Sequence, residues 1–518
     1  MMIKGIKGFC TYLMIFLSSV IIVGSFYIRK NFSNQRVDEM IYYLFNGLEG
    51  VSKDVFIEGI MESFLPFLFL FFLLIAPIIQ YKNSRNIIEI RVNKRKYQFT
   101  VFPLQAIRKY RLVYSTIIFL LALLISYFTI GIDEYVNRMS DYSTIIEDYY
   151  VDGRNVTITF PEEKRNLIIL YLESMENTFM DRENGGAWQY NIIPELTELA
   201  QHYLNFSHTD KLGGPLSVPG TEWTVAAMVA SSAGIPLKIP IGGNSYTNSD
   251  NFLKGAFALG DILKEAGYNL QLMVGSDANY GGRSNYYLAH GTYEIFDVHT
   301  AIARGKMNEE DKVWWGFADS QLFTWAKEEI TKLAQKNEPF SFTFLTVNTH
   351  FPDGYLEEGV NELYPTQYEN VLAHSAQQVA EFVNWFKEQE FSERTTLVII
   401  GDHESMQQEE YFHARVSPDY ERTTYNVFIN SLIEPIQSNN RQFSIFDMYP
   451  TMLASIGVQI EGDRLGLGTN LFSERPTIIE ELGIDYVRDE LEKQSNFYNR
   501  YILKDDYLDL LHQDEEEY

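Results

Sequence analysis

The sequence predicts an α/β protein in which N-terminal transmembrane helices precede a domain with a mostly parallel sheet flanked by helices. Three observations lead to this prediction. Apolar runs without charged residues fill much of the first 135 residues. Beyond them, short aliphatic runs alternate with longer amphipathic runs, which is the pattern of strands joined by covering helices. Several of the aliphatic runs end in a polar side chain, as strands do where a parallel sheet carries a functional site.

Three apolar runs approach the roughly 20 residues that a membrane-spanning helix needs. They are "GFCTYLMIFLSSVIIVGSFYI" (8–28), "FLPFLFLFFLLIAPIIQ" (64–80) and "LVYSTIIFLLALLISYFTIGI" (112–132). A buried core helix is the alternative for the second run, which is the shortest. A cleaved signal peptide is the alternative for the first, but no small-residue cleavage motif follows it. We therefore expect a membrane region with three transmembrane helices over residues 1–135.

Charged residues predict the orientation of these helices. Between the second and third apolar runs, residues 81–111 contain nine Lys and Arg side chains against the single acid Glu89. The positive-inside rule places such a loop in the cytoplasm. The chain is then expected to be a multi-pass protein of the cell membrane, and everything after residue 132 is expected to be extracytoplasmic.

Composition excludes some classes of partner. The chain has 518 residues, 46% of them hydrophobic, and a formal net charge of −27. Nucleic acid is not expected as a partner, because phosphate backbones select basic surfaces. The single cysteine, Cys10, lies in an apolar run, so neither an internal disulfide nor a cysteine-rich metal site is available.

The part of the chain after the membrane region divides into three segments. Residues 136–162 are polar and tyrosine-rich and suggest a linker, residues 163–485 carry the α/β alternation of a catalytic domain, and residues 486–518 form an acidic C-terminal segment. The predicted strands are 165–173, 269–277, 340–349, 395–403 and 423–430. The predicted helices include 188–203, 251–266, 316–336, 370–388 and 445–456.

Polar side chains close or directly follow four of these strands: Glu173, Ser276 with Asp277, His350, and Asp402 with His403. The carboxyl ends of parallel strands meet at one edge of the sheet, so these groups are expected to converge. Glu173, Asp402 and His403 would supply two carboxylates and an imidazole, which suit Mn²⁺ or Zn²⁺. The alternative for Glu173 is a solvated residue before a helix capped by Ser174.

The stretch "SVPGTEWTVAAMVASSAGIPL" (217–237) offers a nucleophile. After the turn at Pro219 and Gly220, Thr221 is predicted to open a helix, which would place its hydroxyl in the positive field of the helix N-terminus. An ordinary Thr N-cap is the alternative. Thr224 lies one helical turn further along the same face and is the alternative nucleophile.

These residues together resemble a known family. "YLES", "PGTEWT", "NTHFP", "GDHESM" and "DMYPTMLASIGVQIEGDRLGLGTNLF", in this order across roughly residues 160–475, are similar to the sulfatase-like branch of the alkaline phosphatase superfamily. They resemble most the membrane-anchored phosphoglycerol transferases that make lipoteichoic acid or modify periplasmic glucans. The resemblance implies an alkaline phosphatase/sulfatase-like fold for residues 163–485.

The resemblance also implies roles for individual residues. Glu173, Thr221, Asp402 and His403 would bind one divalent ion, most readily Mn²⁺ with Zn²⁺ or Mg²⁺ as alternatives, and Thr221 would also be the nucleophile. Arg283 and His350 would hold the phosphate or glycerol of the substrate. From the residues alone, a surface salt bridge stays open for Arg283, and a structural strand-end histidine stays open for His350.

The implied activity is a transfer of glycerol phosphate from phosphatidylglycerol to a hydroxyl of an envelope glycan or a teichoic-acid-like polymer, through a covalent threonine intermediate. Two features depart from the relatives. The sulfatase motif Cys/Ser-x-Pro-x-Arg is absent, which argues against sulfate ester hydrolysis, and the membrane region is shorter than the five helices common among lipoteichoic acid enzymes. A phosphoethanolamine transferase and a non-catalytic envelope polysaccharide-binding protein are the alternatives.

Overall fold

The computed structural model describes residues 2–31, 53–78, 87–92, 95–100, 109–238, 252–407 and 409–503, with residues 37, 40, 41 and 246. The chain divides into two compact units. The first comprises Met1–Val37 with Ser52–Asn137, and the second comprises Asp38–Val51 with Arg138–Tyr518.

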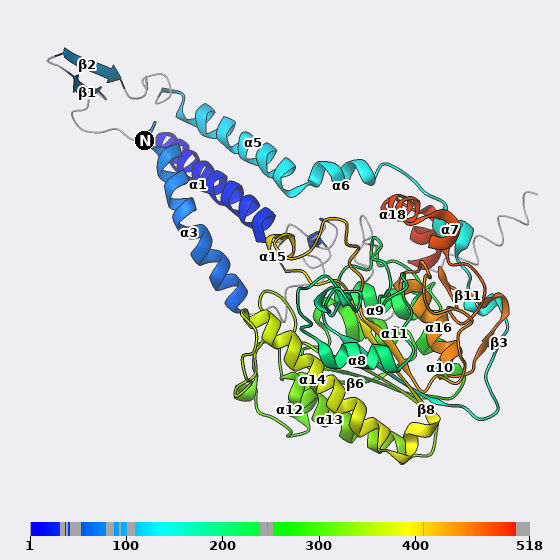
Figure 1. Cartoon of the computed structure of the whole chain (residues 1–518). Helices are drawn as coiled ribbons and strands as arrows, with labels where there is room; N and C mark the ends of the chain where they lie inside the picture. Colours follow the sequence, from blue (N-terminus) through cyan, green and yellow to red (C-terminus); the bar gives the residue numbers. More distant parts are fainter. Residues whose placement is uncertain are drawn as a thin grey trace, which may run out of the picture. The chain divides into compact units, whose positions relative to one another are not determined.

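The first unit is mostly helical. Its long helices are α1 (Met2–Asn31), α3 (Lys53–Ile75) and α5 (Arg111–Ile130), and α1 contacts both of the others (Figure 1). Of the described helices, two contain segments long and apolar enough to cross a membrane, Ile6–Asn31 and Arg111–Ile130. They coincide with the first and third predicted spans.

The second predicted span, 64–80, differs from the structure. Helix α3 begins earlier than the apolar run and ends at Ile75, after which residues 76–78 form a turn; residues 79 and 80 lie outside the described residues. Its apolar part, Gly59–Ile75, is shorter than the other two segments.

The basic loop contains a hairpin that the sequence interpretation omitted. Strand β1 (Ile87–Val92) pairs antiparallel with β2 (Arg95–Thr100). The alternation of aliphatic and charged residues in "IEIRV" is the period-two pattern of a strand. That signal was present in the sequence beside the basic residues.

The second unit is built on a mostly parallel sheet, as predicted. Within the described residues this sheet has six strands in the order β6-β5-β7-β4-β8-β9, and only β9 runs antiparallel to its neighbour. The strands are β4 (Asn166–Leu172), β5 (Asn269–Val274), β6 (Glu294–Phe296), β7 (Phe340–Leu345), β8 (Thr395–Gly401) and β9 (Asn426–Ile429). The short edge strand β6 was not predicted.

Helices cover both faces of this sheet (Figure 1). On the central strand β4, Leu167, Ile169 and Tyr171 join one hydrophobic cluster and the alternate residues join the other. The first cluster includes residues of α9 (Thr224–Ala233), α10 (Leu259–Glu265) and α16 (Met448–Ser455), and the second includes residues of α8 (Pro194–His202), α13 (Asp319–Ala334) and α14 (Gln367–Lys387). Burial on both faces explains why the strands read as continuous apolar runs.

The predicted helices exist, and all but one begin later than predicted; the exception is α14, which begins at Gln367 where residue 370 was predicted. The largest difference is at 251–266, where the helix begins only at Leu259, and Asp261 accepts a hydrogen bond from the backbone N–H of Ala258 at 2.9 Å. A side chain that satisfies a backbone donor ahead of the first turn fixes the start of a helix.

The segment interpreted as a linker, and the described part of the acidic C-terminal segment, belong largely to the folded second unit. In α7 (Ile145–Tyr149), Ile145 and Ile146 are buried, and β3 (Ile158–Thr159) pairs with β10 (Gln459–Ile460). Near the C-terminus, α18 (Ile484–Glu492) buries two apolar side chains, and residues 498–502 form a turn of π-helix. The linker interpretation is therefore wrong for these parts of residues 136–162, and the acidic C-terminal segment is folded as far as Leu503, while residues 504–518 lie outside the described residues.

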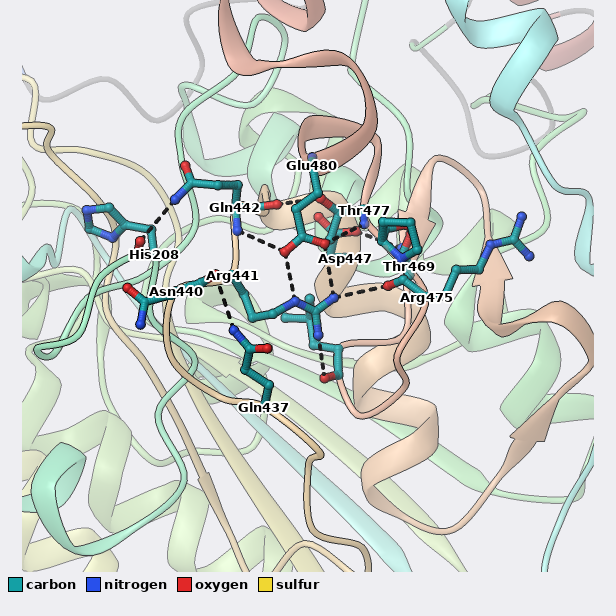
Figure 2. Close-up of polar contacts among 12 residues, drawn as sticks. His208, Gln437, Asn440, Arg441, Gln442, Asp447, Thr469, Arg475, Thr477 and Glu480 are labelled. Carbon is teal, nitrogen blue, oxygen red and sulfur yellow. Dashed lines mark hydrogen bonds and ion pairs between the residues drawn. The ribbon is translucent and has the colours of Figure 1, made fainter.

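A buried arginine ties the C-terminal part of this unit together (Figure 2). Arg441 is only 5% exposed and donates to Glu480 Oε1 at 2.8 Å and Oε2 at 3.3 Å. The same guanidinium donates to the carbonyl oxygens of Leu471 and Arg475. Because a buried charge is tolerated only with such partners, this network fixes the chain around α17 (Ile478–Leu482).

Candidate active site

Three acid and imidazole side chains meet at the carboxyl edge of the sheet, as the sequence predicts. Glu173 follows β4, and Asp402 with His403 follows the adjacent parallel strand β8, where Leu172 lies opposite Gly401. The candidate ligand atoms of the three residues all lie within 4.8 Å of one another, and all three side chains are buried. Glu173 is therefore not the solvated residue of the alternative interpretation.

The imidazole of His403 is oriented toward the two carboxylates. Its Nε2 lies 3.4 Å from Oε1 of Glu173 and 3.5 Å from Oδ2 of Asp402. Its Nδ1 lies 2.8 Å from the backbone carbonyl oxygen of Glu404 and so is placed to donate to it. This second contact is the usual way in which a metal-binding histidine is held with its other nitrogen toward the ion.

The hydroxyl of Thr224 completes the group. Thr224 Oγ1 donates to Glu173 Oε2 at 3.2 Å and lies 3.4 Å from His403 Nε2. Thr224 is the first residue of α9, after the N-cap Trp223, whose indole has no oxygen with which to cap the helix. The hydroxyl therefore lies at the positive end of the helix dipole.

The spacing of these atoms fits a divalent ion. Four ligands at about 2.0 to 2.2 Å from a common ion would lie about 3.3 to 3.6 Å from one another if tetrahedral. The separations between the neighbouring candidate ligand atoms, 3.2 to 3.5 Å, lie close to this spacing. Oδ2 of Asp402 is also buried with no hydrogen-bond partner among the described residues, as expected for an oxygen that binds an ion.

Thr221 does not occupy the predicted position. It precedes α9 by three residues, and its hydroxyl donates to the carbonyl of Val218 at 2.7 Å. Within the described part of the chain no hydrogen bond joins that hydroxyl to the metal-ligand candidates. The prediction that Thr221 opens the helix is wrong, and Thr224, the alternative, takes this place.

A side chain explains the shift of one turn. Glu222 accepts hydrogen bonds from the backbone N–H groups of Gly220 at 2.7 Å and of Thr221 at 3.3 Å. These bonds close a separate turn ahead of the helix. The helix consequently begins after Trp223, whose backbone is extended (φ −140°, ψ 160°).

Burial and mutual charge control the protonation of the cluster. Burial and the charge of Glu173 raise the pKa of Asp402 to about 7. Burial alone would lower the pKa of His403, but Asp402 and Glu173 outweigh it and raise that pKa to about 10. Two buried carboxylates beside one imidazole thus form a site that favours a positive charge at its centre.

Ser174 holds the two carboxylate-bearing loops together. Its hydroxyl donates to Glu173 Oε1 at 2.7 Å, and its backbone N–H donates to Asp402 Oδ1 at 2.8 Å. Its φ of 54° lies in the left-handed region, which costs free energy for a residue other than glycine. These contacts stabilise a backbone conformation that directs Glu173 and Asp402 to the same point.

A buried ion pair lies behind the same loops. Arg422 donates to both carboxylate oxygens of Glu176, at 2.8 and 2.6 Å, and to the backbone carbonyl of Ser405 at 2.9 Å. Glu176 in turn accepts from the backbone N–H of Ser405 at 3.0 Å. The pair therefore joins the loop after β4 to the loop that carries Asp402 and His403.

Arg283 and His350, the predicted substrate-binding residues, line one cavity with Glu173 and Thr224. Arg283 is 5% exposed and donates to Ser276 Oγ at 2.9 Å and to the backbone carbonyl of Asp277 at 2.8 Å. A surface salt bridge therefore does not describe it. Burial lowers the pKa of His350, whose Nδ1 lies 2.8 Å from the carbonyl of Phe351.

Other cavity residues were missed by the sequence interpretation. Tyr280, Trp315 and Thr346 also line the cavity. Thr346 follows β7 directly and its hydroxyl accepts from the backbone N–H of Glu173 at 3.0 Å, so the strand-end rule applied to β7 would have found it. No pattern in the sequence marked Tyr280 or Trp315.

Comparisons with known proteins agree with this architecture. The family profile described as Sulfatase matches residues 165–458. Phosphoglycerol transferase I of Salmonella paratyphi B is 32% identical over 268 residues, which cover 50% of this chain and 33% of that protein. The match thus spans a third of the length of the curated relative.

Solved structures with a similar fold include two envelope enzymes. The lipoteichoic acid synthase LtaP from Listeria monocytogenes is 19% identical, with 64% of this chain and 82% of that chain covered and a TM-score of 0.47. The lipooligosaccharide phosphoethanolamine transferase A (EptA) from Neisseria meningitidis is 14% identical, with 85% of this chain and 83% of that chain covered and a TM-score of 0.49.

The profile match alone includes more than half of the 518 residues. Together with the strand-end site, it establishes that the chain belongs to the sulfatase family of the alkaline phosphatase superfamily.

Proposed function

We propose that this chain is a metal-dependent phosphoglycerol transferase. It moves glycerol phosphate from phosphatidylglycerol to a hydroxyl of an envelope glycan or a teichoic-acid-like polymer, through a covalent intermediate on Thr224. The observation that carries the proposal is the Thr224 hydroxyl, hydrogen bonded to Glu173 and 3.4 Å from His403 at the start of α9. The name of the 32% identical relative supports the substrate class.

A threonine hydroxyl is a weak nucleophile until its proton is removed. A divalent ion held by Glu173, Asp402 and His403 would supply Lewis acidity that favours the alkoxide of Thr224. We propose Mn²⁺ for this ion, with Zn²⁺ and Mg²⁺ as the ions to compare, because two carboxylates and one imidazole suit all three. The positive end of α9 favours the same alkoxide and the negative phosphoryl group beside it.

The reaction has two displacement steps. In the first, Thr224 Oγ1 forms a bond to phosphorus while the bond to the diacylglycerol oxygen breaks, and the proton lost by the threonine is balanced by one gained by the leaving oxygen. In the second, an acceptor hydroxyl forms the new bond to phosphorus, loses its proton, and the threonine hydroxyl is restored. Two inversions at phosphorus give net retention.

Arg283 and His350 would hold the substrate in the cavity. The guanidinium of Arg283 is fixed by Ser276 and Asp277, so it meets an incoming phosphate without first being ordered. His350 lines the same cavity and is buried enough for its pKa to be lowered, which favours a neutral imidazole that hydrogen bonds to the phosphate or glycerol.

The proposed location follows from the donor. Phosphatidylglycerol lies in a membrane, and two helices of the first unit are long and apolar enough to cross one. With the basic loop 81–111 in the cytoplasm, the second unit is extracytoplasmic and the chain is a multi-pass protein of the cell membrane. A reporter fused after residue 150 tests this topology, and activity of a reporter that works only in the cytoplasm would refute it.

The activity is tested with purified full-length chain in detergent. Phosphatidylglycerol labelled in its acyl chains is supplied with Mn²⁺, and labelled diacylglycerol is the expected product. Mass spectrometry of the quenched enzyme should locate glycerophosphate on Thr224. Consumption of labelled phosphatidylethanolamine in place of phosphatidylglycerol would change the donor, and consumption of neither lipid would refute the transferase.

A further inference from the structure

Two adjacent tryptophans form a tight turn beside the candidate active site. Val313 and Gly316 exchange backbone hydrogen bonds of 2.9 Å in both directions, and Trp314 and Trp315 are the two residues between them. Gly316 also pairs with Ser276, the residue that binds Arg283. The tryptophan turn is therefore attached to the strand end that fixes the proposed phosphate-binding arginine.

The backbone of this turn is costly. Trp314 has a φ of 48°, at a turn position that glycine or asparagine normally occupies. The turn also lies close to β5, because a Cβ on Gly316 would be 2.0 Å from the carbonyl oxygen of Gly275. A large side chain held at such a position points to a functional reason for its presence.

The two tryptophans belong to a cluster of partly exposed rings, one end of which lines the cavity. The Trp315 ring lies 4.8 Å from that of His350 and 5.4 Å from that of Tyr280. Next to it, Trp314 stacks on Tyr355 at 6.2 Å with an angle of 25° between the planes. Trp315, His350 and Tyr280 line the cavity and the other two do not, so the cluster extends from the reacting groups to a neighbouring surface.

Polar groups accompany these rings. Asn279 and Asp353, which lie in the same loops as Tyr280 and Tyr355, are exposed. The indole Nε1 of Trp315 is buried and has no hydrogen-bond partner within the described ranges, so it has a hydrogen still to donate. Aromatic faces beside carboxylate and amide groups suit a ligand with both an apolar face and hydroxyl groups.

A sugar ring has this chemistry. The axial C–H groups of a pyranose form an apolar face that stacks on indole and phenol rings, and its hydroxyls bind amides and carboxylates. A glycerol or polyol chain has no such face. An acyl chain would be disfavoured beside the exposed Asp353, because a carboxylate loses hydration against hydrocarbon.

We propose that Trp314, Trp315 and Tyr355 form an acceptor subsite that binds a pyranose ring beside Thr224. The proposal rests on the proposed function and narrows its acceptor to a saccharide. The stacked ring would present a hydroxyl to the cavity that Trp315 and Thr224 both line. Selection of acceptor then depends on the tryptophan turn and not on the metal-binding residues.

The test uses two substitutions in the full-length chain. Trp314→Gly removes the ring and suits a φ of 48°, so it relieves the turn instead of disturbing it. The matched control is Tyr190→Leu, which breaks another stacked aromatic pair, Tyr190 with Tyr364 at 5.6 Å and 15°. Neither ring of that pair lines the cavity.

Binding is measured first, by calorimetry, with tetrasaccharides of glucose, galactose and N-acetylglucosamine. A Thr224→Ala background prevents transfer, so this measurement does not depend on the proposed reaction. We expect at least one tetrasaccharide to bind, with about tenfold weaker binding after Trp314→Gly and no change after Tyr190→Leu. The subsite is refuted if none of the three binds, or if Trp314→Gly binds as tightly as its parent.

Transfer is measured second, with Thr224 intact, as the ratio of product formed on the binding tetrasaccharide to product formed on glycerol. We expect Trp314→Gly to lower this ratio about tenfold. An unchanged ratio would overturn the acceptor assignment even if both products form. A higher Michaelis constant for phosphatidylglycerol with an unchanged ratio would assign the rings to the lipid donor instead.

Discussion

The hydroxyl of Thr224 lies 3.2 Å from Oε2 of Glu173, although the two residues are 51 positions apart in the chain. This contact joins the start of α9 to the end of the central strand β4. It places a hydroxyl, a carboxylate and the positive end of a helix dipole at one point, which is the arrangement that an activated oxygen nucleophile needs.

Substitution of the two threonines is expected to separate their roles. Thr224→Ala should lower diacylglycerol release by more than about 1,000-fold and remove the covalent intermediate, as loss of a nucleophile does. Thr221→Ala removes one hydrogen bond to Val218, worth about 1 kcal/mol of stability, and should leave most of the activity. Glycerophosphate found on Thr221 in wild-type protein would contradict this assignment.

The sheet and its site were largely predictable because one rule determines both. Parallel strands buried on both faces read as apolar runs, and their carboxyl ends converge, so the sequence alone predicts that Glu173, Asp402 and His403 lie together. Strand β6, with only three residues, is too short to leave such a signal.

The remaining differences come from local contacts that no periodicity encodes. The start of α9 depends on the Glu222 side chain bonding to the backbone of Gly220, which shifts the nucleophile by one turn. The tryptophan turn depends on a positive φ at Trp314. The tyrosine-rich segment before residue 162 resembled a linker because its apolar residues follow no regular period, yet Ile145 and Ile146 are buried and β3 pairs with β10.

Removal of the metal ligands is expected to abolish binding of the ion and transfer together. Asp402→Ala should lose Mn²⁺ by elemental analysis and show no recovery when Mn²⁺ is added after chelation, whereas the chelated wild type should recover. The matched control is His299→Ala, in a second group of acidic and imidazole side chains, Asp277, Asp297 and His299. There Asp297 already accepts from two backbone N–H groups, so this variant should keep its metal content.

The buried ion pair behind the site should matter for stability. Arg422→Met leaves the fully buried carboxylate of Glu176 without its guanidinium, which typically costs about 3 to 5 kcal/mol. We expect a clearly lower melting temperature and weaker Mn²⁺ binding, because Arg422 also holds the carbonyl of Ser405.

A second substitution tests the physical reason for that loss. Arg422→Met with Glu176→Gln removes the uncompensated charge, so it should recover much of the melting temperature while metal binding stays weakened. If Arg422→Met has the same melting temperature as the wild type, the Arg422–Glu176 ion pair contributes little to stability and does not position the two loops.

Ionisation of one buried acid should contribute a loss of stability as the pH rises from about 4 to about 7. Burial raises the pKa of Asp319 from its usual 3.8 to about 7, although the backbone N–H groups of Val347 and Asn348 donate to it. The folded state therefore keeps a proton that the unfolded state has already lost. The contribution of the protonated Asp319 to the free energy of unfolding is complete below about pH 3.8 and is lost as the pH rises to about 7. At about 1.4 kcal/mol per pKa unit, the loss is at most about 4 kcal/mol.

Asp319→Asn tests this linkage because its amide does not titrate. The variant should be less stable than wild type at low pH. In the wild type both carboxyl oxygens accept from backbone N–H groups, whereas in the variant the amide N–H₂ faces one of these donors and cannot accept from it. Its melting temperature should then decline less steeply than that of the wild type as the pH rises from 4 to 7. The measurement is the difference between the melting temperatures of the variant and the wild type, taken across this pH range in the same buffer series. If that difference does not change with pH, Asp319 ionises in the folded state near its usual pKa.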